Sequence, residues 1–151
     1  MPQSLSSLFV HIVFSTKHRK PFLKCRELRK RLYAYLASIC SEMNCVPRNI
    51  GGVEDHTHIL TQLARTAAAS VLVRELKRES SKWIKKNDPT LQTFAWRRGY
   101  GVFSLSPVHV PRLDRYIENQ EEHHKKETFQ GEMRRLYRLH DVAIDERYIW
   151  E

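Results

Sequence analysis

The chain has 151 residues, a length that fits one domain over residues 1–151 and excludes a multidomain architecture. Hydrophobic residues make up 41% and charged residues 28%, so the chain can form a core and lacks the composition of a disordered segment. Lysine and arginine number 26 against 17 acidic residues, which gives a net charge of +9. This excess favours a polyanionic partner such as nucleic acid, although charge alone is no proof.

The cysteines and the hydropathy pattern indicate a cytoplasmic protein. Cys25, Cys40 and Cys45 are odd in number and lack CxxC spacing, so neither a disulfide framework nor a zinc site is predicted. No apolar run approaches the roughly 18 residues that a membrane helix needs, and the N-terminus lacks the basic region of a signal peptide. We therefore expect no export and no membrane partner.

The first half of the chain predicts a strand, a helix and two extended segments. Residues 8–15 (LFVHIVFS) are rich in β-branched and aromatic residues, which favours a strand. Apolar side chains recur at helical spacing over residues 26–43, with basic residues on the other side. Residues 46–54 and 56–63 follow as short extended segments, separated by the Gly51–Gly52 pair and the acidic step after it.

The second half predicts more helix. Residues 67–86 form a helix with a basic outer side, and residues 94–104 form a strand or hairpin. A third helix runs to about Lys126, and Pro111 either kinks it or delays its start. A last helix covers residues 130–140. The order β-α-β-β-α-β followed by helices predicts an α+β fold of the ferredoxin-like, split βαβ kind, with an antiparallel sheet and additional C-terminal helices.

The cluster Asp55-His56-Thr57-His58 is a candidate metal site. His56 and His58 are two residues apart in a predicted strand, so their side chains project to the same side. Two neutral imidazoles suit a divalent cation, although most such sites need a third ligand. Taken alone, an HxH pair in a chain with 8 histidines is more readily explained as a structural pair.

Tyr116 and Gln120 form a second cluster on the third predicted helix. Gln120 falls on the apolar stripe of this helix, where its amide needs a hydrogen-bond partner. Tyr116 lies one turn earlier on the same side, so both side chains can reach one site. The alternative is that the Tyr116 hydroxyl is hydrogen-bonded within the fold and Gln120 satisfies a backbone group.

Three further stretches accompany these clusters: SSKWI, FAWRRGYGVFSLSP and YIENQEEHHKK. Together with HTH after a Gly-Gly pair and YxxxQ in a late helix, they resemble the small bacterial single-tyrosine transposases of the HUH type, the IS200-like family, and the related domesticated repeat-associated transposases. The likeness covers nearly the whole chain. It departs at Thr57, where the family usually has a hydrophobe, and at Pro111, which bears on the placement of Tyr116.

The resemblance implies a metal-dependent transposase that cleaves and rejoins single-stranded DNA and recognises hairpin-forming element ends. His56 and His58 match two metal-binding histidines, Gln120 matches the third ligand, and Tyr116 matches the nucleophile that forms a 5′-phosphotyrosine. The implied cofactor is Mg²⁺ or Mn²⁺. The implied partners are single-stranded DNA hairpins and a second copy of the chain, in a homodimer where the tyrosine helix of one subunit can complete the metal site of the other.

Basic residues near aromatic ones predict a groove that follows phosphates and stacks bases. A charge run is usually a solvated face, but the net charge of +9 and the nearby aromatic residues favour DNA contact here. The candidate DNA-binding residues are Lys17, Arg19, Lys20, Lys77, Arg78, Lys82, Lys85, Arg97 and Arg98.

Three other histidines are expected to have structural roles. His123 and His124 are interpreted as a solvated helix end rather than as further ligands, and His11 as a satisfied strand histidine rather than a contact of the metal site. One alternative function is a non-catalytic or domesticated hairpin-binding module, for which the basic and aromatic residues suffice. The other is a metal-dependent nuclease or phosphodiesterase that uses water and leaves no protein on its product.

Overall fold

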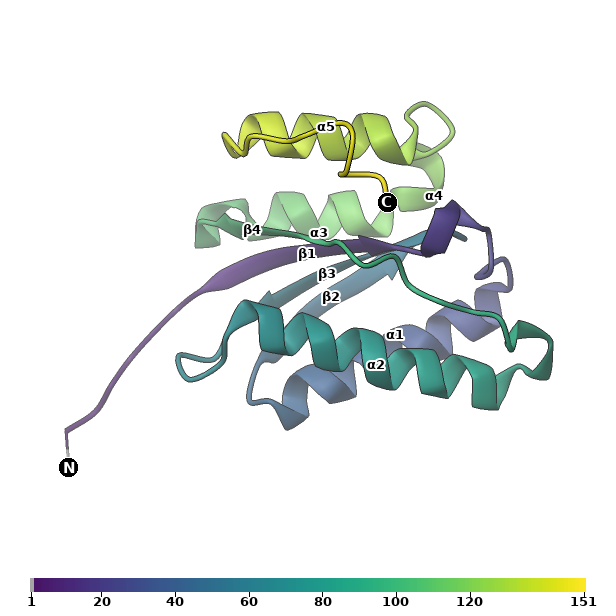
Figure 1. The fold of residues 1–151 in the computed structure, drawn as a ribbon. Helices are drawn as coiled ribbons and strands as arrows, with labels where there is room; N and C mark the ends of the chain where they lie inside the picture. The colour runs from purple at the N-terminus through teal and green to yellow at the C-terminus, as the bar shows by residue number, and fades with distance from the viewer. Residues whose placement is uncertain (1) are drawn as a thin grey trace.

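Helices cover both faces of a four-stranded antiparallel sheet in the computed structural model, which describes residues 2–151 (Figure 1). The strands are β1 (Phe9–Ser15), β2 (Val46–Gly52), β3 (His56–Gln62) and β4 (Gly101–Leu105), in the spatial order β2-β3-β1-β4. The first two helices are α1 (Arg26–Glu42) and α2 (Ala69–Asn87). The chain order β1-α1-β2-β3-α2-β4 and the antiparallel pairing confirm the predicted α+β fold.

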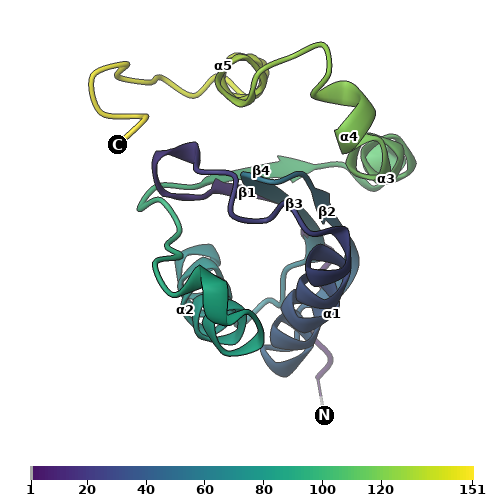
Figure 2. The same cartoon turned by 90° about the vertical axis from the view of Figure 1, so that its right-hand side faces the viewer.

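The two faces of the sheet carry different helices. Helices α1 and α2 pack side by side on one face, and α3 (Val110–Glu118), α4 (Gln120–His123) and α5 (Phe129–Leu139) lie over the other (Figure 2). Successive residues of a strand point to opposite faces. The central strands β1 and β3 therefore supply alternate side chains to both helix layers.

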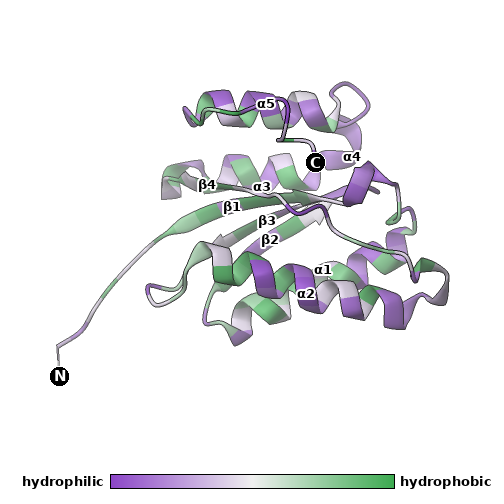
Figure 3. Ribbon diagram, in the orientation of Figure 1, coloured by the Kyte–Doolittle hydropathy of each residue, from purple (hydrophilic) through white to green (hydrophobic). Residues whose placement is uncertain are grey.

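The main hydrophobic core lies between the sheet and the pair α1 and α2. Ile12 and Phe14 of β1 and Ile59 of β3 are fully buried there against aliphatic residues of the two helices. The polar residues of α1 and α2 lie on their outer sides, as the hydropathy colours show (Figure 3). Among residues 2–151 no helix has both the length and the apolar character needed to cross a membrane.

The predicted third helix is wrong as a continuous element. It is interrupted at Asn119, whose backbone (φ −97°, ψ 18°) ends α3, and only the short α4 follows. Asparagine favours helix ends because its side chain competes for backbone hydrogen bonds. Pro111 lies in the first turn of α3, where a missing amide proton costs nothing, so it marks the helix start and produces no kink.

Two strand boundaries also differ from the prediction. The Gly51–Gly52 pair lies inside β2, and the chain reverses over the next residues before β3. The predicted strand over residues 94–104 is reduced to β4, with an isolated bridge between Trp96 and Thr16. In the preceding segment the backbone carbonyls of Arg97, Arg98 and Gly99 bind the Lys77 ammonium.

Candidate active site

His56 and His58 lie side by side on the central strand β3, beneath the second helix layer. Both side chains are fully buried, and their ring centroids are 5.2 Å apart. The outer nitrogen of each ring is hydrogen-bonded: His56 Nδ1 lies 2.7 Å from Asp55 Oδ1, and His58 Nδ1 lies 2.8 Å from His11 Nε2. Metal-binding histidines usually have such a partner on the ring nitrogen that does not bind the metal.

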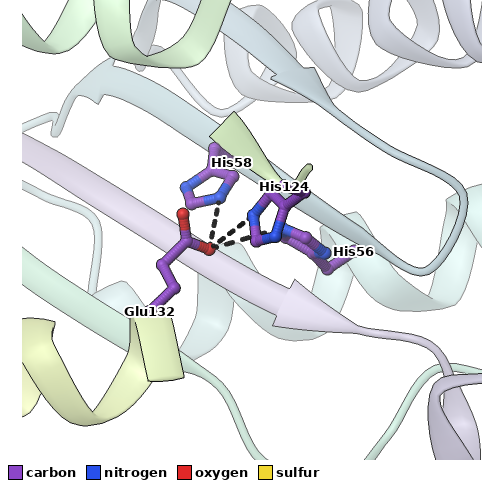
Figure 4. Close-up of side chains that lie close together, drawn as sticks. All are labelled: His56, His58, His124 and Glu132. Carbon is purple, nitrogen blue, oxygen red and sulfur yellow. Dashed lines mark hydrogen bonds and ion pairs between the residues drawn. The ribbon is translucent and has the colours of Figure 1, made fainter. Parts of the chain in front are cut away.

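Three imidazoles converge on one carboxylate oxygen (Figure 4). The Nε2 atoms of His56, His58 and His124 lie 3.3, 3.1 and 3.2 Å from Glu132 Oε1. The outer nitrogen of His124 is occupied as well, since Nδ1 lies 2.8 Å from the backbone oxygen of Glu127. The four side chains could hold a metal ion, because their ligand atoms all lie within 4.8 Å of one another.

Tyr116 reaches the same carboxylate from α3. Its hydroxyl donates a hydrogen bond to Glu132 Oε2 and accepts one of 2.9 Å from Arg135 Nη2. The Tyr116 ring packs on His58 with centroids 5.7 Å apart. One chain therefore brings the candidate nucleophile and the histidine pair together without a second subunit.

Gln120 is 1% exposed and lies beside this cluster. Its Oε1 is 3.3 Å from His56 Nε2, and its Nε2 donates to Glu132 Oε2 at 3.4 Å. Its Nε2 also lies 3.4 Å from the backbone oxygen of Tyr116, which was the alternative role expected for this amide. The Gln120 amide oxygen thus lies at the edge of the histidine cluster.

The electrostatics of the cluster keep Glu132 ionised. Burial opposes ionisation, but the surrounding histidines, His58 first, hold the pKa of the Glu132 carboxyl far below its usual range. Burial also opposes protonation of His56, yet hydrogen bonds with Asp55 and Glu132 raise its pKa to about 9. The pKa of the Tyr116 hydroxyl is raised by burial and by the Glu132 charge. The phenol is therefore protonated at neutral pH and needs help to become a nucleophile.

A glycine in β2 sets how closely α3 approaches the sheet. A Cβ atom at Gly51 would lie 2.8 Å from Ile117 Cγ2 and 2.9 Å from the backbone oxygen of Ile117. Ile117 follows Tyr116 directly and precedes Gln120 by one turn. The close contact at Gly51 therefore positions the helix that carries both functional side chains.

The contributions of His124, Glu132 and Arg135 were missed by the sequence analysis. His124 was expected in a solvated helix end, but the fold turns its side chain into the cluster, where it is only 11% exposed. Glu132 lies on the buried side of α5 with Phe129 and Met133. The sequence did carry a signal for Glu132, because a charged residue on the apolar side of a helix needs a partner. The same reasoning had selected Gln120. His11 is a satisfied strand histidine as expected, and its partner is His58.

Seven of the nine predicted DNA-binding residues lie at the surface, exposed or half-buried: Lys17, Arg19, Lys20, Arg78, Lys82, Lys85 and Arg98. The other two are engaged inside the protein. The Lys77 ammonium lies 2.6, 3.1 and 2.8 Å from three backbone oxygens of the segment before β4, and burial lowers its pKa to about 8. Arg97 is 5% exposed and donates to the backbone oxygen of Ile149.

Two grooves are lined in part by basic residues. One, of about 680 Å³, opens beside Tyr116 and is also lined by His109, Arg112, Arg135 and His140. The other, of about 460 Å³, lies along α2 and combines basic residues with aromatic ones. Its lining includes Arg74, Lys77, Arg78, Lys85, Trp96, Arg98 and Tyr100.

Comparison with known proteins identifies the family and the fold. The sequence model of the family described as "Transposase IS200 like" matches residues 4–120, which include the histidine pair, Tyr116 and Gln120. The chain belongs to the IS200-like transposase family. The matched segment ends at Gln120, so His124 and Glu132 lie outside it.

Solved structures of two transposases share the fold. A proposed transposase from Deinococcus radiodurans R1 is 21% identical, with a TM-score of 0.62. The alignment covers 80% of this chain and 95% of the transposase chain. A REP-associated tyrosine transposase bound to a REP hairpin is 13% identical, with a TM-score of 0.61, covering 96% of this chain and 90% of its own. No curated protein was found to match the chain.

Proposed function

We propose that this IS200-like transposase cleaves and rejoins single-stranded DNA through a 5′-phosphotyrosine on Tyr116, with a divalent cation at the histidine cluster. One observation carries the proposal. Three imidazole nitrogens lie within 3.3 Å of one Glu132 oxygen, and the Tyr116 hydroxyl donates a hydrogen bond to the other, all within one chain. A nucleophile beside a metal-binding set is the arrangement that phosphoryl transfer to a tyrosine needs.

The donor set fits a divalent transition metal. His56, His58, His124 and Glu132 supply three nitrogens and a carboxylate, and Gln120 adds an amide oxygen at the edge of the set. Imidazole suits transition metals, whereas Mg²⁺ prefers oxygen ligands and bound water. Of the two expected cofactors, Mn²⁺ therefore suits this site better than Mg²⁺. When bound, the ion polarises the scissile phosphate and stabilises the charge that develops on its oxygens.

The chain itself supplies activation of the nucleophile. Tyr116 Oη attacks phosphorus, the bond from phosphorus to the 3′ oxygen breaks, and a free 3′-hydroxyl leaves. Glu132 Oε2 accepts a hydrogen bond from the phenol and orients it, the phenolic proton passes to solvent, and solvent protonates the leaving oxygen. Arg135 Nη2 lies 2.9 Å from Oη, where its charge stabilises the forming phenolate. Rejoining reverses these steps and needs no ATP, because the phosphotyrosine keeps the phosphodiester energy.

The two grooves supply routes for the substrate. The groove beside Tyr116 would take the single strand, and the basic and aromatic groove along α2 would take the hairpin stem and its unpaired bases. The hairpin bound to the REP-associated transposase supports this class of partner. A homodimer stays a prediction, and the proposed chemistry does not depend on it.

The proposal is tested with single strands that carry the hairpins flanking the coding region, labelled at one end. With Mn²⁺ the wild-type protein is expected to form a covalent adduct that survives denaturing electrophoresis. Tyr116→Phe is expected to abolish it, while the matched control Tyr148→Phe, at an exposed tyrosine, keeps it. An adduct that persists in Tyr116→Phe contradicts the assignment. Cleaved DNA without attached protein would instead favour the water-using nuclease.

A further inference from the structure

A small cationic cavity lies next to the catalytic cluster. Its volume is about 140 Å³. No aspartate or glutamate of the described part of the chain contributes to its wall, which consists of Ser15, His18, Arg19, Arg97, Phe129, Gln130 and Trp150. A cavity with two guanidinium groups and no carboxylate favours an anion.

Two buried donors in this wall have no partner within residues 2–151. Ser15 is fully buried and Arg97 is 5% exposed. The hydroxyl of Ser15 and the Nε of Arg97 make no hydrogen bond to the protein. Leaving a buried polar group unsatisfied lowers stability, so such groups in a native fold call for an explanation. A ligand that accepts hydrogen bonds in the cavity would satisfy both.

The rim of the cavity is held in an unusual backbone conformation. His18 and Arg19 both have positive φ angles, 57° and 53°, in the left-handed region that side chains with a Cβ rarely adopt. These two consecutive residues lie shortly after β1, and both line the cavity. The strained backbone therefore places a histidine and an arginine at the entrance of the cavity.

The cavity adjoins the proposed reaction centre. Ser15 pairs with His56 in the register of β1 and β3, and side chains of directly opposed residues lie on the same face of a sheet. Phe129, another wall residue, packs on the His56 ring with centroids 4.6 Å apart. An anion in the cavity would thus lie close to His56 and to the divalent cation that His56 is proposed to bind.

We propose that this cavity binds a backbone phosphate of the DNA strand, next to the phosphate that Tyr116 attacks. The assignment of this phosphate to a DNA strand rests on the proposed function, whereas the preference for an anion rests on the cavity alone. Ser15 and Arg97 donate hydrogen bonds to the phosphate oxygens, and Arg19 supplies the charge at the entrance. Fixing one phosphate beside the scissile one would hold the strand in register for attack.

The test measures binding without metal, so that cleavage plays no part. Inorganic phosphate, the single strand dT8, and dT8 with uncharged methylphosphonate linkages are titrated into chelator-treated protein, and the indole N–H signal of Trp150 is followed by NMR. Phosphate and dT8 are expected to shift this signal saturably, and the uncharged strand is not. The indole of Trp83, which lines neither this cavity nor the two grooves, is the internal reference.

Variants locate the effect. Arg19→Gln is expected to weaken dT8 binding about tenfold, the equivalent of one hydrogen bond to a charged group. Arg138→Gln, an exposed arginine elsewhere on the surface, should change it little. Ser15→Ala should weaken binding without lowering stability, since its hydroxyl has no partner in the fold.

Three outcomes would overturn the phosphate site: no shift of Trp150 with phosphate or dT8, an equal shift with the uncharged strand, which would indicate a nucleobase pocket, or equal effects of Arg19→Gln and Arg138→Gln. Failure of the proposed function is seen separately, as a missing covalent adduct while phosphate binding persists.

Discussion

The two faces of the sheet are equally buried but differ in chemistry. On the α1 and α2 side, Ile12, Phe14 and Ile59 are fully buried in an apolar core. On the other side, His56 and His58 are just as buried, yet they contact other polar groups. The same two central strands supply both sets. The polar chemistry is thus confined to one face, although that face also carries apolar clusters around Val13 and Leu60. Substitutions in the core under α1 and α2 should therefore affect stability without affecting the site.

The largest effect on stability is expected on the apolar face. Leu76→Ala removes a fully buried side chain of α2 and should lower the free energy of unfolding by about 2–5 kcal/mol. Leu76→Met, which keeps the volume, should cost less than about 1.5 kcal/mol. Urea unfolding measures both. Metal affinity at temperatures where the variants are folded should be unchanged, and a parallel loss of metal binding would break the proposed separation of the faces.

A smaller effect is expected where α3 meets the sheet. Gly51→Ala places a methyl group against Ile117 and should cost about 1–3 kcal/mol, because the backbone of α3 must move. Since Tyr116 and Gln120 move with it, covalent-adduct formation should fall more than stability alone explains. Gly99→Ala meets its nearest atom at 3.4 Å and is the matched control. Full adduct formation in Gly51→Ala would show that the position of α3 is not critical.

On the polar face, Glu132→Gln keeps the shape of the side chain and removes its charge. Mn²⁺ affinity, measured by calorimetry, should fall about tenfold to a hundredfold. The reason is that the metal ion would lose the charged carboxylate ligand that lies beside the three imidazoles. Glu122→Gln removes the same charge from an exposed position and should have no such effect. Unchanged Mn²⁺ affinity in Glu132→Gln would leave Gln120 as the better candidate for the third ligand.

The smallest effect concerns the residue between the two histidines. Thr57 points to the apolar face, and its buried hydroxyl has no hydrogen-bond partner among the described residues. Thr57→Val removes that unsatisfied group and should raise stability by about 1 kcal/mol, seen as a higher melting temperature. Adduct formation should not change. A destabilised variant would mean that the hydroxyl is satisfied by water.

The fold was largely predictable because its signals are local. The apolar spacing of α1 and α2 and the β-branched run of β1 each lie within one stretch of sequence, and the predicted order of elements is confirmed. The prediction was wrong at Asn119, where one helix becomes two, and at the Gly51–Gly52 pair. There the strand continues through the glycines, which pair with His58 and Thr57 of β3. The close approach of α3 to Gly51 is a contact between distant segments that no local pattern shows.

The site was predictable only in part for the same reason. His56, His58, Tyr116 and Gln120 lie in short motifs, and the structure brings all four together. The role of Glu132 depends on how α5 folds back over β3, and that of His124 on the break after α3. Such placement follows from the turns between helices, whose geometry depends on long-range packing.

Because β3 serves both faces, its length is constrained more tightly than that of any loop. Inserting or deleting a single residue between His56 and His58 would place the two imidazoles on opposite faces of the sheet, so that one of them would enter the aliphatic layer. One such genetic event would remove catalysis and folding together. Relatives of this chain can therefore be expected to differ in loop length freely, but to keep the spacing along β3 unchanged.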